Sequence, residues 1–95
     1  MIIYNVTYSV DKEIAEEWIS WMKDTYIVEV LKTDRFFDCR IFKVLTHEDE
    51  QTFSYAVQFH SHTLKDVEEF INKNNIDDSR YGDRVLGYPT LLEEV

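Results

Sequence analysis

The chain opens with MIIYNVTYSV (residues 1–10), in which bulky apolar side chains alternate with smaller, mostly polar ones. A period of two residues is typical of a β-strand that buries one of its faces. The bulky face carries Ile2, Tyr4, Val6, Tyr8 and Val10, and the other face carries Ile3, Asn5, Thr7 and Ser9. We therefore expect a central strand whose bulky face is covered by helices.

The same alternation returns in Thr52 to His60, which we expect to be the second central strand. One of its faces carries Phe53, Tyr55, Val57 and Phe59, and the other carries Ser54, Ala56, Gln58 and His60. Two more strands are predicted. In Phe36 to Leu45, one face carries Phe37, Cys39, Ile41 and Leu45, and the other carries Phe36, Phe42 and Val44. The last strand, Val85 to Leu92, contains Pro89, which lacks a ladder donor and confines that strand to an edge.

Two stretches have the spacing of amphipathic helices, Ile14 to Tyr26 and Leu64 to Ile71. Asp11 can cap the first, while Thr63 and Asp66 approximate a capping box for the second. The apolar side of the first helix carries Ile14, Ala15, Trp18, Ile19, Trp21, Met22 and Tyr26. The apolar residues that follow Tyr26 leave this side, so we expect the helix to bend or restart near Thr25.

The predicted order, β-α-β-β-α-β, is that of the ferredoxin-like α+β fold. Right-handed crossovers place both helices on one face of a four-stranded antiparallel sheet. Asp34 lies in the turn after the first helix, where it can adopt the left-handed conformation usually given to glycine. With 95 residues, the chain is predicted to be a single domain over residues 1–95.

The charge balance and the cysteine content limit the classes of partner that we expect the protein to bind and the cellular compartment that we expect it to occupy. Ten basic residues face nineteen acidic ones, and a net charge of −9 repels phosphate backbones, so nucleic acids and anionic membranes are poor partners. The single cysteine, Cys39, cannot form an internal disulfide, which favours a reducing, cytoplasmic setting. The apolar residues at the start of the chain read as a strand and not as a secretion signal or a membrane span. We expect a small soluble cytoplasmic protein.

The sheet face opposite the helices is unusually poor in charge. Its central positions carry Ile3, Asn5, Thr7, Ser9, Thr52, Ser54, Ala56, Gln58 and His60, although 31% of the chain is charged. Exposed sheet faces usually carry Lys and Glu, so we expect a second copy to cover this one in a C2 homodimer. The alternative is a solvated face that is rich in Thr and Ser because strands favour Thr.

Few residues in the sequence are candidates for metal binding or catalysis. His60 and His62 are two apart and could share a face, but two ligands are too few for a metal site, and none is predicted. Cys39 has no activating neighbour at a fixed spacing and is expected to be a small buried side chain. Glycine-rich phosphate loops, nucleophile elbows and acidic calcium loops are absent from the sequence. No cofactor is therefore predicted, and whether the chain is an enzyme stays open.

A pocket is the remaining candidate for a site. Aromatic residues could line it between the first helix and the sheet, with the polar groups nearest by strand register completing it. The candidate residues are Asn5, Trp18, Trp21, Tyr26, Arg40, Tyr55, Gln58, His60 and Tyr88. An aromatic stripe at helical spacing is also how an ordinary core looks, so the alternative is that these rings only fill the interior.

Several segments together resemble an uncharacterised family of short bacterial proteins that is classed as a domain of unknown function. They are Met1 to Thr7, Glu17-Trp18 with Trp21-Met22, the turn from Thr33 to Phe36, Tyr55 to Gln58, and Thr90 to Val95. The resemblance covers the whole chain. It implies a fold like the dimeric α/β barrels, a superfamily that also holds small monooxygenases, haem-degrading enzymes and lactone isomerases. It implies no established activity.

Two functions remain. The first is a homodimeric domain whose role is binding or association, which agrees with the lack of catalytic motifs. The second is a cofactor-independent or haem-using enzyme that resembles the barrel monooxygenases, with Asn5, Trp18, Tyr26 and His60 as pocket groups. The second rests on fold analogy, and this fold hosts many functions.

Overall fold

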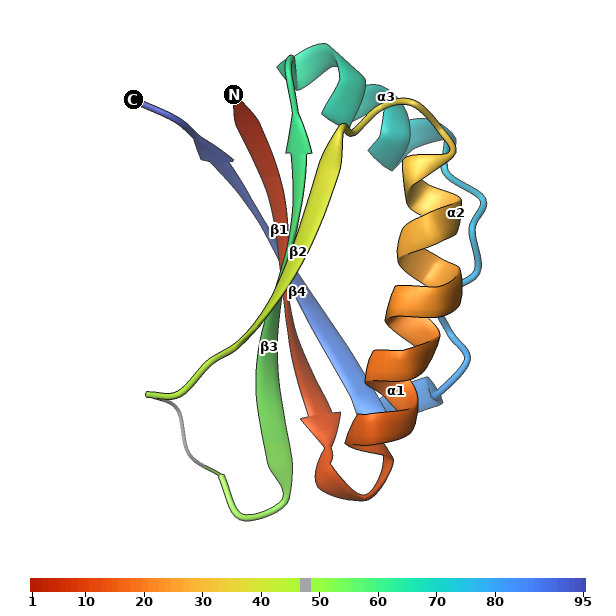
Figure 1. Ribbon diagram of the computed structural model, residues 1–95, viewed down its shortest axis with the longest axis vertical. Coiled ribbons are helices and arrows are strands. Elements are labelled where there is room, and N and C mark those ends of the chain that lie inside the picture. Colours follow the sequence, from red (N-terminus) through yellow and green to blue (C-terminus); the bar gives the residue numbers. More distant parts are fainter. Residues whose placement is uncertain (47–48) are drawn as a thin grey trace.

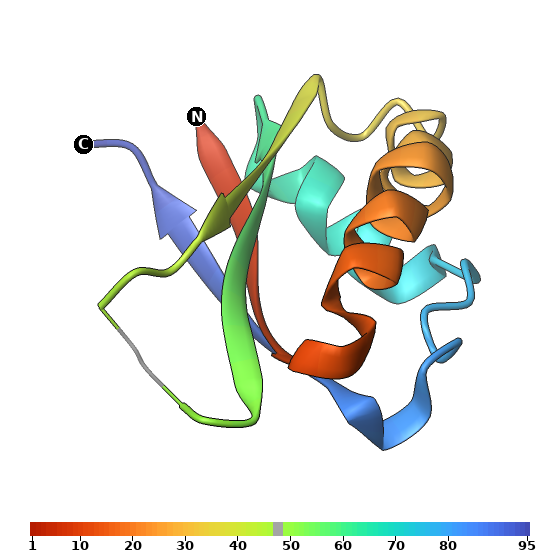
Figure 2. The same cartoon turned by 60° about the horizontal axis from the view of Figure 1, so that its bottom comes forward.

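A computed structural model describes residues 1–46 and 49–95 and shows a two-layer α+β arrangement (Figure 1). The strands are β1 (Ile2–Asp11), β2 (Asp38–Lys43), β3 (Thr52–Ser61) and β4 (Val85–Glu93). They form one antiparallel sheet in the order β2-β3-β1-β4. All helices lie on one side of this sheet (Figure 2). The predicted ferredoxin-like β-α-β-β-α-β order is therefore confirmed, with β1 and β3 at the centre and Pro89 on an edge strand.

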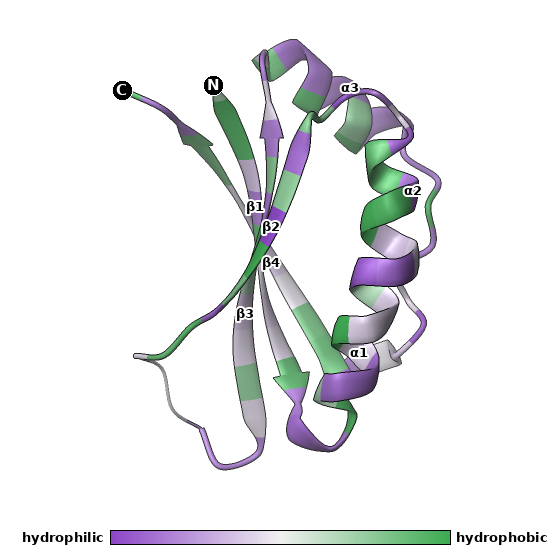
Figure 3. Ribbon diagram, viewed as in Figure 1, coloured by the Kyte–Doolittle hydropathy of each residue, from purple (hydrophilic) through white to green (hydrophobic). Residues whose placement is uncertain are grey.

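The first helical segment consists of four pieces. A 3-10 turn (Lys12–Ile14) leads into α1 (Ala15–Trp21), a π-helical turn (Met22–Tyr26) and α2 (Ile27–Leu31). Asp11 caps it, because its carboxylate accepts the Glu13 N–H at 3.0 Å. The irregularity predicted near Thr25 is thus present, as a π turn. Apolar residues colour much of α2 in Figure 3.

The π turn explains which side chains this segment buries. Trp18, Met22, Tyr26 and Val30 follow one another at intervals of four, and each is at most 6% exposed. In a regular helix of 3.6 residues per turn, a series with this spacing drifts sideways by about 40° at every step. The wider π turn winds less per residue and cancels part of that drift. The four side chains therefore stay in line above the sheet.

The second helix, α3 (Leu64–Lys73), begins as the capping pattern predicts. The Thr63 hydroxyl oxygen accepts the Asp66 N–H at 3.2 Å, which identifies Thr63 as the N-cap. Arg35 joins the end of the first helical segment to α3, since its guanidinium forms ion pairs with Asp66 and Glu69 on α3. Asp34, just before it, has a φ of +62°, so the predicted left-handed turn is confirmed.

The core lies between the helices and the bulky faces of β1 and β3. Directly opposite residues such as Tyr8 and Tyr55 point to the same side of the sheet, as the alternation predicts. Trp18 packs over this pair, with ring centroids 5.2 Å from Tyr8 and 5.3 Å from Tyr55. No helix in the described residues is long and apolar enough to cross a membrane.

The prediction for β2 was wrong in its bounds and in its faces. The strand begins at Asp38, and Phe36 before it is buried against Phe59 at 5.3 Å between ring centroids. Phe42, predicted on the same face as Phe36, lies instead on the far side of the sheet and is 47% exposed. The reason is one extra residue at the strand entrance. Phe37 donates its N–H to the His60 carbonyl at 2.9 Å, yet Asp38 is the residue paired with His60, and such an extra residue reverses the alternation.

Cys39 belongs to the core side of β2. It lies opposite Phe59 and packs against the hydrophobic cluster. Burial, followed by the charge of Asp38, raises the pKa of the Cys39 thiol to about 12. The thiol is therefore protonated at neutral pH and is a poor nucleophile in the folded chain.

Replacing Trp18 tests the packing of the core. We expect Trp18→Ala to lower the free energy of unfolding by about 3–5 kcal/mol, because it removes a large side chain that is 1% exposed. Trp21→Ala is the matched control, since Trp21 is only partly buried at the edge of the same cluster, and its loss should be clearly smaller. Urea unfolding followed by circular dichroism gives both values. Equal losses would contradict the central position of Trp18.

The reactivity of Cys39 tests its burial. At pH 8 we expect iodoacetamide to alkylate the folded chain roughly a hundredfold or more slowly than the chain in concentrated urea, because the raised thiol pKa suppresses the thiolate. The rates can be followed by mass spectrometry, with a short cysteine peptide as the reference in both solutions. A folded-state rate close to that of the peptide would show an accessible, activated thiol.

Candidate functional site

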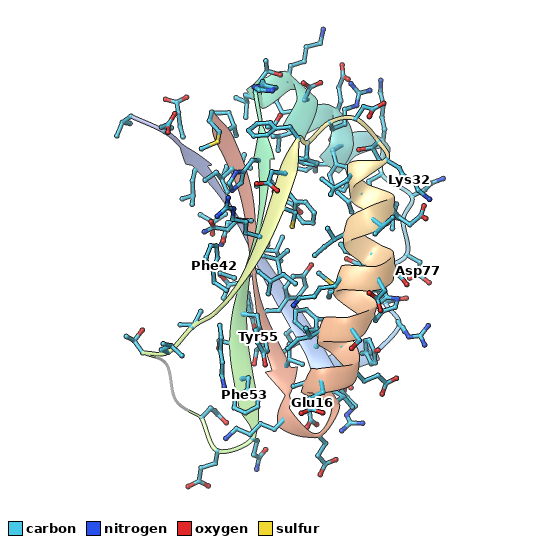
Figure 4. The ribbon with its side chains drawn as sticks, in the orientation of Figure 1. Glu16, Lys32, Phe42, Phe53, Tyr55 and Asp77 are labelled. Carbon is cyan, nitrogen blue, oxygen red and sulfur yellow. The ribbon has the colours of Figure 1, made fainter. Side chains whose placement is uncertain are left out.

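The side of the sheet that carries no helix, called the open face below, is the main candidate site. Strand register arranges its side chains in rows that run across the sheet. The rows are Asp38-His60-Ile3-Leu92, Arg40-Gln58-Asn5-Thr90, Phe42-Ala56-Thr7-Tyr88 and Ser54-Ser9-Leu86. Phe42 and the side chains near it point away from the helices in Figure 4. The face that the sequence predicts to be poor in charge is thus one continuous surface.

The centre of the open face is neutral and already closely packed. Asn5 and Ser54 are each only 8% exposed, although the helices lie on the other side of the sheet. The Asn5 amide donates a hydrogen bond to the Thr7 hydroxyl oxygen at 3.2 Å. Short neutral side chains leave the middle of the sheet flat, which suits close contact with another flat surface.

Large apolar side chains flank this centre. They come from the two edge strands and from the entrance to β2: Phe37 (50% exposed), Phe42 (47%), Leu86 (48%), Tyr88 (59%) and Leu92 (41%). Leaving such side chains in water forfeits burial free energy of about 1.5–3 kcal/mol for each one that could be fully buried. Several large apolar side chains exposed on one face of a protein are typical of an interaction site.

The charges of the open face stand at its margins. Asp38 and Arg40 lie on edge strand β2, where their side chains pair with each other at 3.5 Å. Asp11 ends β1 and is held by Arg84 at 3.1 Å. Bringing another surface onto the centre therefore requires no stripping of water from an isolated charge.

A shallow depression interrupts the open face. It has a volume of about 360 Å³ and lies between Tyr88 on one side and Val44 on the other, with Thr7, Ser9 and Ser54 as its floor. This space could receive an apolar side chain from a partner. Ser and Thr hydroxyls on the floor are polar but uncharged, so they add orientation without a large desolvation cost.

The nine residues predicted as pocket groups fall into two sets on opposite sides of the sheet. Trp18 and Tyr55 pack in the core, and Trp21 and Tyr26 lie nearby with ring centroids 5.4 Å apart. The open face holds the others: Asn5, Arg40, Gln58, His60 and Tyr88. The sheet separates the two sets, so the nine residues do not line one cavity.

The two neighbouring histidines take part in aromatic packing. The Phe37 ring stacks on His62 at 4.3 Å and meets His60 edge-on at 5.9 Å between ring centroids. In the part of the chain that the structure describes, no group of three or more His, Cys, Asp or Glu residues is placed to hold a metal ion. His47, predicted to lie in an acidic loop, falls outside the described residues.

Sequence reasoning missed two features. The first is the apolar flank on β4, although the alternating Leu86, Tyr88, Thr90 and Leu92 could have revealed it. The second is a cavity of about 410 Å³ on the helix side, lined by Tyr4, Tyr8, Tyr26 and Asp78 among others. No sequence signal pointed to Asp78, because the segment around it follows no helical or strand period.

Comparisons with known proteins identify a family. Neither the curated proteins nor the solved structures gave a match. A family model described as a domain of unknown function, DUF4286, matches residues 1–95. The match spans the whole chain, so this protein belongs to the DUF4286 family.

Proposed function

We propose that the chain forms a C2 homodimer through the open face and acts as a binding or association domain. The observation that carries this proposal is the combination of a flat neutral centre with five exposed apolar flanking side chains on one surface. The dimeric α/β-barrel arrangement, in which two sheets pack face to face, is the form of dimer that such a surface suits.

The size of the open face is close to what a standard dimer interface buries on each partner. The four strands lie about 4.8 Å apart, and their 10, 6, 10 and 9 residues each rise about 3.3 Å, which gives a projected area of about 550 Å². The relief of the side chains adds to this value, so it approaches the roughly 800 Å² per partner that standard interfaces bury. A second copy that aligns its sheet with the first would cover nearly the whole face.

Electrostatics favour a second copy over a charged partner. Each chain has a net charge of −9, so two copies repel each other unless their contact surfaces are nearly neutral. The open face meets that condition, because the charged side chains at its margins are paired, Asp38 with Arg40 and Asp11 with Arg84. Two identical neutral, apolar-flanked surfaces are complementary to each other in an isologous contact.

The alternative of a monooxygenase-like enzyme is not proposed. It requires Asn5 and His60 to act in one pocket with Trp18 and Tyr26, and the sheet lies between these two pairs. A shared fold alone is a weak basis for assigning an activity.

Charge introduced on the open face should separate the two copies. We expect the wild-type chain to sediment as a dimer at micromolar concentration, and Tyr88→Glu to weaken dimerisation at least about tenfold, because it places a carboxylate in each half of a desolvated interface. Tyr88 is 59% exposed in the single chain, so folding should survive the change. Sedimentation velocity over a concentration series gives the dissociation constants.

The matched control is Ile71→Glu. Ile71 is 48% exposed on α3, on the opposite side of the sheet, so the same charge should leave the dimer intact. A wild-type chain that stays monomeric throughout the series would refute the dimer. A dimer that Ile71→Glu disrupts and Tyr88→Glu does not would place the interface on the helices.

A further inference from the structure

The helix side of the sheet contains a cavity that the proposed dimer does not use. Its volume is about 410 Å³, and it lies where β1 and β4 meet the first helical segment and the connection that follows α3. Three tyrosines line it, Tyr4 and Tyr8 from β1 and Tyr26 from the π turn. Asp78 and Ser79 of the connection complete the polar part of the lining.

Two irregular features of the chain shape this cavity. The π turn keeps Tyr26 in line above the sheet, and π turns inside helices occur frequently at functional sites. Gly87 on β4 leaves room for the Tyr8 ring, because a Cβ atom there would lie 2.9 Å from Tyr8 Cε1. Any other residue at position 87 would displace a ring that also packs on Trp18.

The hydroxyl groups of two of these tyrosines have no hydrogen-bond partner in the described part of the chain. Tyr8 is 8% exposed and Tyr26 is 6% exposed, yet neither hydroxyl forms a hydrogen bond within the described residues. Burial, followed by the charges of acidic neighbours that include Asp78, raises the pKa of both tyrosines. The hydroxyls therefore stay neutral and can both donate and accept hydrogen bonds at the cavity wall.

The charge of the cavity is negative. Asp78 is the one carboxylate in the lining, no basic residue lines the cavity, and Asp78 forms no ion pair within residues 1–46 and 49–95. The Asp78 carboxylate would repel an anionic ligand, and no basic side chain lines the cavity to offset that repulsion. A bare metal ion would find too few charged oxygen atoms for its coordination shell. A ligand that carries one positive charge and several N–H donors fits better.

Part of the lining is apolar. Val6, Val85 and Pro89 form this part of the wall on β1 and β4. They can pack against a short hydrocarbon chain, while the electron-rich tyrosine rings favour a nearby cationic nitrogen.

We propose that this cavity binds a small organic ammonium ion. Its N–H groups donate hydrogen bonds to the Tyr8 and Tyr26 hydroxyl oxygens and to the Asp78 carboxylate, and its hydrocarbon part rests on Val6, Val85 and Pro89. The cavity lies on the opposite side of the sheet from the open face. The proposed binding site and the proposed dimer are therefore independent, and a result against one does not refute the other.

The chain offers a convenient spectroscopic test. It contains two glycines, Gly82 and Gly87, and both line the cavity, so their amide signals in a ¹H–¹⁵N spectrum report on its occupancy. The probes are n-butylammonium, butyrate and butan-1-ol, which share one hydrocarbon chain and differ in charge. We expect saturable shifts of both glycine signals with millimolar n-butylammonium, and much weaker effects of the other two probes.

Substitutions of Asp78, Asp77 and Tyr26 test which side chains bind the ammonium ion. Asp78→Asn should weaken binding of n-butylammonium about fivefold, because it removes a partly solvated charge partner. Asp77→Asn is the matched control, since Asp77 lies on the outer surface next to the first helical segment (Figure 4) and its carboxylate accepts hydrogen bonds from Ser79. The control should bind like the wild type. Tyr26→Phe, which keeps the buried ring, should also weaken binding.

Any one of the following results would overturn the proposal. Absence of saturable glycine shifts in the wild type would show that the cavity does not bind the ammonium ion. Equal binding of butyrate or butan-1-ol would show that charge does not select the ligand. An Asp77→Asn variant that loses as much affinity as Asp78→Asn, or an Asp78→Asn variant that loses none, would place the site elsewhere. Unchanged binding to Tyr26→Phe would remove the phenol groups from it.

Discussion

The contact of Trp18 with the central tyrosines is the interaction on which the rest of the structure depends. Its ring lies over Tyr8 of β1 and Tyr55 of β3, which are direct partners across the two middle strands. This packing attaches the first helical segment to the sheet and assigns one side of every strand to the interior. The opposite side is left to form the open face, and Tyr4, Tyr8 and Tyr26 form part of the cavity wall on the helix side.

Local signals made most of the fold predictable. The alternation in β1 and β3, the caps at Asp11 and Thr63, and the left-handed Asp34 each act within a few residues, so the sequence shows them directly. The faces of β2 were not predictable in this way. An extra residue at Phe37 reverses the alternation, and only pairing with His60 on β3 reveals it.

The candidate site was harder to predict because it depends on contacts between distant segments. The nine residues grouped as one pocket belong to two sides of the sheet. Strand alternation already placed Asn5, Gln58 and His60 on the side away from the helices, so they could have been excluded from a pocket under the first helix. Asp78 reaches the cavity from a connection without periodicity, and Tyr26 faces it because a π turn replaces regular helix. The neutral character of the open face, by contrast, followed from strand alternation alone.

Pro89 has a consequence for how the sheet meets other chains. It lies on the outermost strand, β4, where it offers no N–H to an incoming strand. When another strand pairs with this edge, which is how a sheet begins to grow into a fibril, it therefore lacks one backbone hydrogen bond in the middle of β4. The addition of strands at the β4 edge is therefore disfavoured. Another chain can instead pack against a face of the sheet.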